Sequence, residues 1–238
     1  SLLPVPQQCE LGKNYLNLDK VTLSTPVLAD DWTEFVGRSG GKVTGKSSVK
    51  IEVNLVPSIP EARVNADEAY RLQVTDRLIK VEALTERGVY WALQTLRQLQ
   101  TRRGNGTAIR CCKITDWPAF RVRGFMQDVG RSYISLEELK REIEILSRFK
   151  VNVFHWHLTE NQSWRLESKV FPMLNDSANT TRMPGKYYTL EQARELVAFC
   201  KRHQVLLIPE IDMPGHSAAF VRTFRHDMQS AEGMKILK

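Results

Sequence analysis

The fold of this chain is decided by the stretch Val205-Leu-Leu-Ile-Pro-Glu-Ile-Asp-Met-Pro-Gly-His216. Its first four residues are apolar and predict a strand that is buried on both faces, as strands of parallel sheets are. Two carboxylates, Glu210 and Asp212, and an imidazole, His216, follow directly. A helix cap and a turn would explain this strand end by itself. Two earlier stretches repeat the arrangement, however, and α/β barrels keep their active sites at the carboxyl ends of their strands.

The two earlier stretches are the predicted strands 121–126 and 151–158. The helix after the first opens with the capping box Ser135-Leu-Glu-Glu138, and the helix after the second opens with Thr189-Leu-Glu-Gln192. Strand, helix, strand, helix and strand at this spacing predict right-handed parallel βαβ units.

Polar side chains gather at the carboxyl ends of all three predicted strands. Because parallel neighbours bring these ends to one rim, we expect the side chains to share a bowl-shaped site. The first strand contributes Asp128 and Arg131, with Arg123 inside it; the second contributes His157, Thr159, Glu160, Asn161 and Gln162; and the third contributes Glu210, Asp212 and His216.

Residues 1–117 predict a separate small α/β domain. Residues 49–55 alternate apolar and polar side chains, and residues 70–74 and 78–83 do likewise around a short polar turn, which predicts a hairpin. Thr85 can cap a long helix, and residues 111–115 predict a last short strand. We interpret the acidic pair Asp67-Glu68 as surface charge.

The composition is that of an ordinary globular protein, with 42% hydrophobic and 26% charged residues among 238. No apolar run reaches the roughly 20 residues of a membrane span, and residues 1–6 have no signal-peptide pattern. The formal charge of +7 is dispersed in short basic runs, so we expect no nucleic acid partner. Four irregularly spaced cysteines support neither a disulfide framework nor a zinc site.

At these residues the chain resembles family 20 glycoside hydrolases, the β-N-acetylhexosaminidases. Three strings are similar to that family's first three barrel strands: Arg123-Gly-Phe-Met-Gln-Asp-Val-Gly-Arg131, Phe154-His-Trp-His-Leu-Thr-Glu-Asn-Gln-Ser-Trp-Arg165 and Ile208-Pro-Glu-Ile-Asp-Met-Pro-Gly-His216. Residues 3–6 and 88–99 resemble the small domain that precedes the barrel. The resemblance implies an α/β fold with a small α/β N-terminal domain (1–117), followed by the first three βα units of a truncated (β/α)₈ TIM barrel (118–238).

The resemblance also implies an activity, the removal of terminal N-acetylglucosamine or N-acetylgalactosamine with retention at the anomeric carbon. The substrate's acetamido oxygen attacks C1, so this family departs from the two-carboxylate scheme. A glutamate protonates the leaving oxygen and the preceding aspartate orients the acetamido group. That His-x-Gly-x-Asp-Glu string is absent, and only 120 residues follow Pro118, whereas a complete barrel domain needs about 250. We expect no cofactor, no metal and no turnover by this chain alone.

Roles for single residues follow from the same resemblance. Arg123 matches an arginine that binds hydroxyls of the terminal sugar, with an internal salt bridge as its structural alternative. His216 matches a histidine that supports the acid, with a turn histidine as its alternative. Asn161 falls where relatives place an aspartate that tunes the acid, a charge that an amide cannot supply. His157, Glu160 and Glu210 complete the expected substrate site; for His157 and Glu210, site and structural roles remain open.

Two rival functions remain open. A metal-dependent TIM-barrel hydrolase would use His155, His157, Glu210, Asp212 and His216, which are metal-ligand types. A non-catalytic carbohydrate-binding fragment is the other rival. The expected partners are glycans that end in N-acetylhexosamine, and three uncovered barrel strands predict self-association through the open edge. By resemblance, the expected location is periplasmic, cell-surface or secreted.

Overall fold

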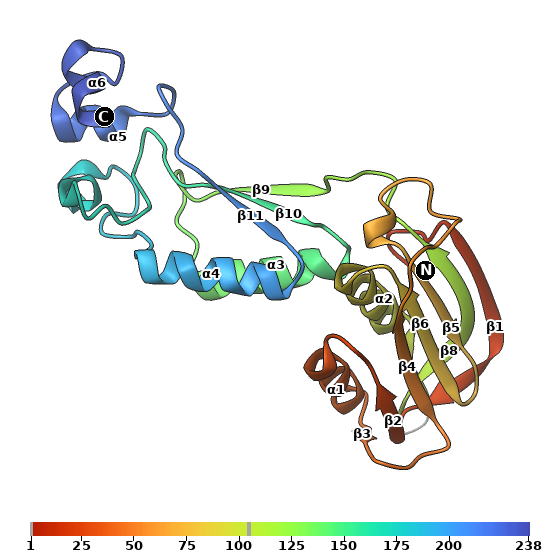
Figure 1. Ribbon diagram of the computed structural model, residues 1–238. Helices are drawn as coiled ribbons and strands as arrows, with labels where there is room; N and C mark the ends of the chain where they lie inside the picture. Colours follow the sequence, from red (N-terminus) through yellow and green to blue (C-terminus); the bar gives the residue numbers. More distant parts are fainter. Residues whose placement is uncertain (1, 104–105) are drawn as a thin grey trace. The chain divides into compact units, whose positions relative to one another are not determined.

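The computed structural model describes residues 2–103 and 106–238, which form two compact units (Figure 1). The first unit contains the residues up to Arg121 together with Arg148–Lys150. The second contains Val122–Ser147 and Val151–Lys238. The contacts thus divide the chain between Arg121 and Val122, and the domain boundary after residue 117 stays a prediction.

An eight-stranded mixed sheet forms the framework of the first unit. Its strands run in the order β1-β8-β5-β6-β4-β2-β3, with β7 paired to β8. The expected hairpin is confirmed, because β5 and β6 are antiparallel and place Leu72 opposite Val81. The strands are β1 Gln8–Asn17, β2 Lys20–Ser24, β3 Lys42–Val43, β4 Lys50–Leu55, β5 Tyr70–Val74, β6 Leu78–Ala83, β7 Gln100–Arg103 and β8 Gly106–Asp116.

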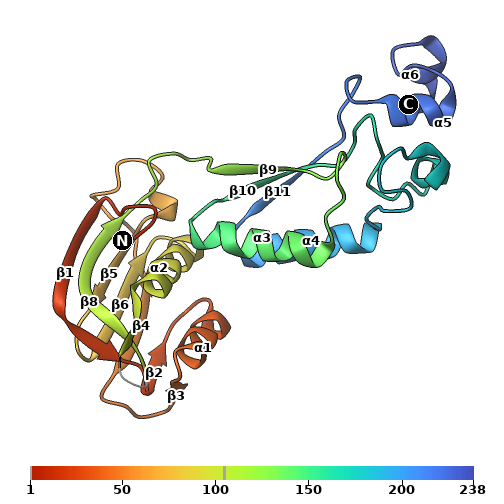
Figure 2. The same cartoon turned by 180° about the vertical axis from the view of Figure 1, so that it is seen from behind.

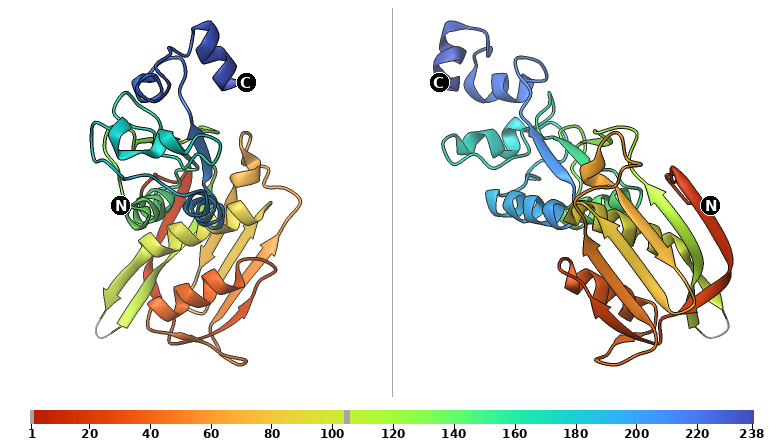
Figure 3. Two further views of the ribbon diagram at one scale, coloured as in Figure 1. Left: turned by 90° about the vertical axis from the view of Figure 1, so that its left-hand side faces the viewer. Right: turned by 45° about the vertical axis from the view of Figure 1, so that its right-hand side comes forward.

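Helices α1 (Ala29–Arg38) and α2 (Glu86–Leu99) lie on one face of this sheet (Figures 1 and 3). The predicted cap of α2 is confirmed, since Thr85 Oγ1 accepts a hydrogen bond from the backbone N–H of Gly88. The helices and the sheet enclose one apolar core between them. Its largest members are Trp32, Phe35, Tyr70, Tyr90 and Trp91.

Three expectations for the first unit need correction. The last strand is longer than residues 111–115, because β8 extends to Gly106 along its partners β1 and β7. The strand β1 itself was not expected. The interpretation of Glu68 as surface charge is wrong: Glu68 lies in a short 3₁₀ helix (Ala66–Glu68), is 2% exposed and accepts a 2.7 Å hydrogen bond from Trp91 Nε1.

The second unit is built on a three-stranded parallel sheet in the order β11-β10-β9. The strands are β9 Gly124–Asp128, β10 Val153–His157 and β11 Leu206–Glu210. The helices are α3 Leu136–Arg148, α4 Leu190–Arg202, α5 Ala218–Phe224 and α6 Ala231–Leu237, with short 3₁₀ helices at Pro172–Asn175 and Ser177–Asn179. Within the described ranges, no helix combines the length and apolar character that a membrane span requires.

Helices α3 and α4 lie on the same side of this sheet (Figure 2). Both predicted capping boxes are present, at Ser135 and at Thr189. Side chains such as Phe154 and Leu207 pack toward the helices with Leu139 and Leu196. The opposite face is uncovered within the described residues, and it exposes 54% of Met126, 58% of Leu206 and 43% of Ile208.

Candidate active site

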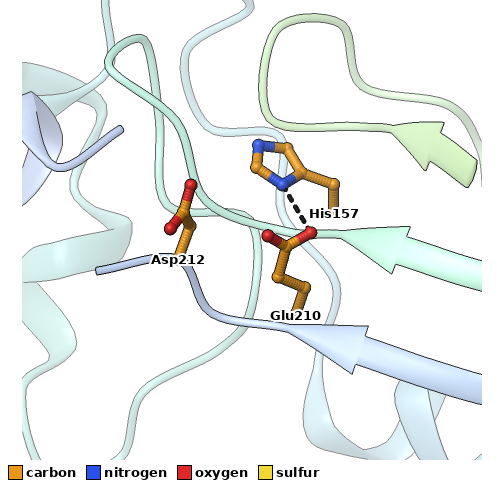
Figure 4. Close-up of side chains that lie close together, drawn as sticks. All are labelled: His157, Glu210 and Asp212. Carbon is orange, nitrogen blue, oxygen red and sulfur yellow. Dashed lines mark hydrogen bonds and ion pairs between the residues drawn. The ribbon is translucent and has the colours of Figure 1, made fainter. Parts of the chain in front are cut away.

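Polar side chains meet at the carboxyl end of the second sheet, and Figure 4 shows three of them, His157, Glu210 and Asp212, at the ends of β10 and β11. The parallel register places His157 opposite Asp128 on one side and opposite Glu210 on the other. The expectation that these strand ends share one rim therefore holds for Asp128, His157 and Glu210.

Glu210 joins two histidines of the central strand. Its Oε2 lies 2.8 Å from His157 Nδ1 and 2.7 Å from His155 Nε2. Burial raises the pKa of the Glu210 carboxyl, but hydrogen bonds from His157 and His155 outweigh burial and hold that pKa below its usual range. Glu210 is therefore an ionised acceptor that fixes the orientation of both imidazole rings.

A second cluster surrounds Glu160, in the loop after β10. The side chain is 1% exposed, and its Oε1 contacts both the guanidinium of Arg131 and Nδ1 of His216. Arg131 also binds Asp128 Oδ2 at 2.5 Å, and it remains 48% exposed. The other ring nitrogen of His216, Nε2, lies 3.9 Å from Asp212 Oδ2. His216 is thus held between two carboxylates, and the buried carboxylate of Glu160 is contacted by the guanidinium of Arg131 and the imidazole of His216.

The close approach of Glu160 depends on a glycine in the loop after β9. A Cβ on Gly130 would lie 2.7 Å from Glu160 Cβ and 3.2 Å from its backbone nitrogen. Ser163 Oγ ties the two loops together through a 2.6 Å hydrogen bond to the carbonyl oxygen of Gly130. Arg165, fully buried, donates to the neighbouring carbonyl of Val129 at 3.0 Å. These contacts fix the backbone on which Arg131 and Glu160 are placed.

Asn161 lies in the loop after β10, and its expected role beside the acid stays a prediction. Its side-chain Oδ1 accepts a 3.2 Å hydrogen bond from the backbone N–H of Ala218, and its carbonyl accepts from Arg222 at 2.6 Å. The side chain thus connects the loop after β10 to the start of α5. The group that contacts His216 is Glu160, one residue earlier, so a carboxylate does stand beside the histidine.

For Arg123 the expected role as a sugar contact stays a prediction. Arg123 precedes β9, and its backbone pairs with Asn152 ahead of β10, with an N–H to Oδ1 distance of 2.8 Å. Five residues of strand separate it from Asp128, or about 16 Å at roughly 3.3 Å per residue. By alternation it also shares a face with Phe125, which stacks on the buried Phe154. The arginine at the rim is Arg131, which the sequence shows three residues after Asp128.

The site also contains a set of metal-ligand types, as the metal-dependent rival requires. His157, Glu210 and Asp212 each offer one ligand atom, and these atoms lie within 4.8 Å of one another (Figure 4). Zinc and iron are held by such residues. In this arrangement, however, Glu210 Oε2 already accepts hydrogen bonds from two imidazoles, so an ion would have to replace them.

Comparison with known proteins covers nearly the whole chain. Residues 120–235 match the model of the glycosyl hydrolase family 20 catalytic domain, and residues 1–117 match that of domain 2 of the same family. A β-hexosaminidase from Porphyromonas gingivalis is 31% identical over 246 residues, which cover 94% of this chain and 31% of that protein. A β-hexosaminidase from Vibrio furnissii is 37% identical over 168 residues, or 65% of this chain and 28% of that protein.

Solved structures show the same similarity in three dimensions. An inactive mutant of an exo-β-N-acetylglucosaminidase from Vibrio harveyi superposes with a TM-score of 0.81 at 31% identity, over 97% of this chain and 39% of that chain. The same enzyme in complex with N-acetylglucosamine gives a TM-score of 0.79 at 30% identity, with the same coverage. The expected α/β architecture, an N-terminal domain and the start of a catalytic domain, is confirmed. The chain spans about a third of the length of the curated relatives it matches.

Proposed function

Because the chain belongs to glycosyl hydrolase family 20, we propose that it is part of a β-N-acetylhexosaminidase that removes terminal N-acetylglucosamine or N-acetylgalactosamine from glycans. The observation that carries this proposal is the cluster of Arg131, Glu160 and His216 at the carboxyl rim of the barrel strands. It is a charged, partly exposed arrangement on which a sugar and a general acid can be positioned.

The proposed reaction proceeds with retention and is assisted by the substrate. The acetamido oxygen of the sugar attacks C1 as the glycosidic bond breaks, which gives an oxazolinium ion that water then opens. The carboxyl group that protonates the leaving oxygen does not come from these 238 residues, which lack the His-x-Gly-x-Asp-Glu string. His216 supports that acid by a hydrogen bond, and Glu160 and Asp212 hold the imidazole in place.

Arg131 is the proposed contact to the sugar hydroxyls. A guanidinium has five N–H donors in a fixed plane, and Asp128 and Glu160 occupy only part of them. These two carboxylates fix the guanidinium, and its exposed edge can bind two neighbouring oxygens of the substrate. Arg131 is thus proposed as a sugar contact in addition to Arg123, whose role the resemblance implies.

The proposal is tested with a chimera that joins residues 1–238 to the remaining barrel of the Vibrio harveyi enzyme. We expect the folded chimera to hydrolyse a chromogenic N-acetyl-β-glucosaminide and not the matching β-glucoside, which has no acetamido group. The 238-residue chain alone should give no turnover. A folded chimera that cleaves both substrates equally, or a chain that turns over by itself, would contradict the proposal.

Three variants of the chimera test the assigned roles. Glu160→Gln should lower kcat by roughly 100-fold, because His216 loses its charged partner. Arg131→Met should act mainly on kcat/KM, since it removes contacts to the sugar. Arg123→Met tests the role that the resemblance implies for that arginine, and it should also act mainly on kcat/KM. An unchanged kcat/KM in the Arg131 variant would reject the assignment of Arg131.

The metal-dependent rival is favoured by one observation, the His157, Glu210 and Asp212 group. Metal analysis of the purified chimera distinguishes a metal-dependent hydrolase from the proposed substrate-assisted hexosaminidase. Stoichiometric zinc that is removed by a chelator together with activity would favour a metal-dependent hydrolase. Full activity after chelation supports the substrate-assisted reaction.

For the cellular location we propose the periplasm, the cell surface or the medium. The proposal rests on the proposed function, because glycans with terminal N-acetylhexosamine are found on surfaces and in secreted material. Cell fractionation with an antibody against residues 1–238 tests it, and recovery in the cytoplasmic fraction alone would reject it.

A further inference from the structure

A cavity of about 310 Å³ lies in the first unit, beside the last turns of α1 and α2. Its volume is at the lower end of the range of roughly 300–1,000 Å³ that small-molecule sites occupy. Its wall combines aromatic rings with guanidinium and amide groups. The residues that matter are Phe35, Arg38, Gln94, Arg97, Arg148 and Phe149, all of which belong to the first unit.

Gln94 is a buried polar residue of this wall whose side chain can both donate and accept hydrogen bonds. It is 1% exposed, and neither its Oε1 nor its Nε2 has a hydrogen-bond partner within residues 2–103 and 106–238. A buried amide with no partner costs free energy, so such groups are rare and require a reason. A bound ligand that accepts from Nε2 supplies one.

Arg97 lies one helical turn after Gln94 and faces the same cavity. Its Nε is buried and has no partner in the described part of the chain. Two further guanidinium groups, those of Arg38 and Arg148, line the cavity. Arg38 is paired with Glu34 at 2.5 Å, and no carboxylate is among the described residues that line the cavity. The cavity is therefore cationic.

We propose that this cavity binds a small oxyanion, a phosphate, sulfate or carboxylate group on a body no larger than a monosaccharide. Arg97 and Gln94 donate hydrogen bonds to the anion, because a guanidinium fork matches the geometry of these groups. Arg38 and Arg148 add positive charge, and Phe35 and Phe149 contact the apolar part of the ligand. This site is independent of the proposed hydrolase reaction, since it uses none of the residues at the barrel rim.

Isothermal titration of the 238-residue chain at low salt is the test, with inorganic phosphate, inorganic sulfate and glucuronate as probes and neutral glucose as their control. We expect saturable binding of at least one anion and none of glucose. Comparison of the probes shows which anionic group is bound. Binding of phosphate or sulfate identifies a tetrahedral anion, and binding of glucuronate alone identifies a carboxylate on a sugar ring.

Three variants connect the binding to the cavity. Arg97→Gln should weaken the anion about tenfold or more, and Gln94→Leu, which keeps the volume, about three- to tenfold. Arg97→Lys keeps the charge, loses the fork and should give an intermediate loss. Arg102→Gln removes the same charge from the exposed strand β7, outside the cavity, and should change the affinity less than twofold.

Thermal melts keep the test decisive if a variant is less stable. A ligand that binds the folded state raises Tm, so phosphate or glucuronate should raise the Tm of the parent and of Arg102→Gln, but not that of Arg97→Gln. The proposal is overturned if no probe binds, if glucose binds as well as glucuronate, or if Arg102→Gln weakens the anion as much as Arg97→Gln does.

Discussion

The two sheets of this protein differ in the face that their helices leave uncovered. In the first unit that face carries charged side chains in ion pairs, such as Arg71 with Glu61 and Lys80 with Glu82, both at 2.6 Å. In the second unit it carries Met126, Leu206 and Ile208, all substantially exposed. The first sheet thus has one apolar and one charged face. The second sheet has apolar residues on both faces, as parallel barrel strands require.

The difference shows how stability and function are divided. In the first unit, the apolar face of the sheet is buried against the unit's own helices, and the outer face carries charged side chains in ion pairs. The second unit places its charged residues at one end of the strands, where Arg131 and His216 contact Glu160, and His155 and His157 contact Glu210. We expect substitutions in the first unit to act on folding, and substitutions at the rim to act on local geometry and catalysis.

The largest effect is expected from Trp91→Ala, which breaks the core of the first unit. Trp91 is 1% exposed, and its Nε1 donates to the buried carboxylate of Glu68. Loss of the ring leaves a cavity and removes a partner of Glu68, which together should lower the free energy of unfolding by about 3–5 kcal/mol. Urea denaturation followed by tryptophan fluorescence measures it. Trp117→Ala, which changes a tryptophan that is not fully buried, is the control and should cost clearly less.

The next effect is expected from Gly130→Ala at the rim. The new Cβ would lie within 2.7–3.2 Å of three atoms of Glu160, one of them backbone, so one of the two loops must move. We expect a loss of about 1–3 kcal/mol in stability and a fall in the activity of the chimera, since Glu160 holds His216. Gly37→Ala, where a Cβ meets no atom within 4 Å, is the matched control. An active, fully stable Gly130→Ala variant would show that the position of Glu160 is unimportant.

The sequence predicts the order of strands and helices well because these depend on local periodicity and capping. The capping boxes at Ser135 and Thr189 and the hairpin of β5 and β6 are examples. It misplaces the start of the first strand of the second sheet, which begins at Gly124 and not at residue 121, so Arg123 precedes that strand. A shift of three residues changes which end of a strand a side chain occupies, and periodicity does not fix strand ends.

The sequence also does not show which of Glu160 and Asn161 contacts His216, for another physical reason. Both lie in a loop, where no repeating geometry determines which of two neighbours points toward His216. The outcome depends on Gly130, which allows Glu160 to approach, and on Ala218, whose N–H binds Asn161. Likewise, the burial of Glu68 depends on Trp91, 23 residues away in the sequence. These contacts between distant segments cannot be read from composition or spacing.

A smaller effect is expected from Glu210→Gln, and it depends on pH. The folded state holds the pKa of Glu210 below its usual 4.5, because the hydrogen bonds from the two histidines outweigh burial. This contribution to stability is present above pH 4.5 and is lost as the pH falls through the lower, folded pKa. At neutral pH the variant should be less stable by roughly 1 kcal/mol.

Urea denaturation at a series of pH values between about 3 and 7 checks this prediction. The difference between the parent and Glu210→Gln should shrink as the solution becomes more acidic. Glu137→Gln, on the exposed side of α3, is the control, and it should have a smaller effect on stability at every pH because its ion pair with Lys140 is exposed to solvent. A stability difference that is constant over the whole pH range would mean that the pKa of Glu210 is the same in the folded and unfolded states.

The smallest effect on stability, and the sharpest test of the contrast between the sheets, is expected from Ile208→Lys. Ile208 is 43% exposed on the uncovered face of the second sheet, so a lysine there should change the free energy of unfolding by no more than about 0.5 kcal/mol. The same change interrupts the apolar surface through which we expect copies of this chain to associate. Sedimentation velocity should therefore show less self-association than for the parent chain. Lys80→Gln, on the charged face of the first sheet, should not alter it. If Ile208→Lys associates as the parent does, the uncovered face is not the contact, and the apolar residues of the second sheet have no role between copies.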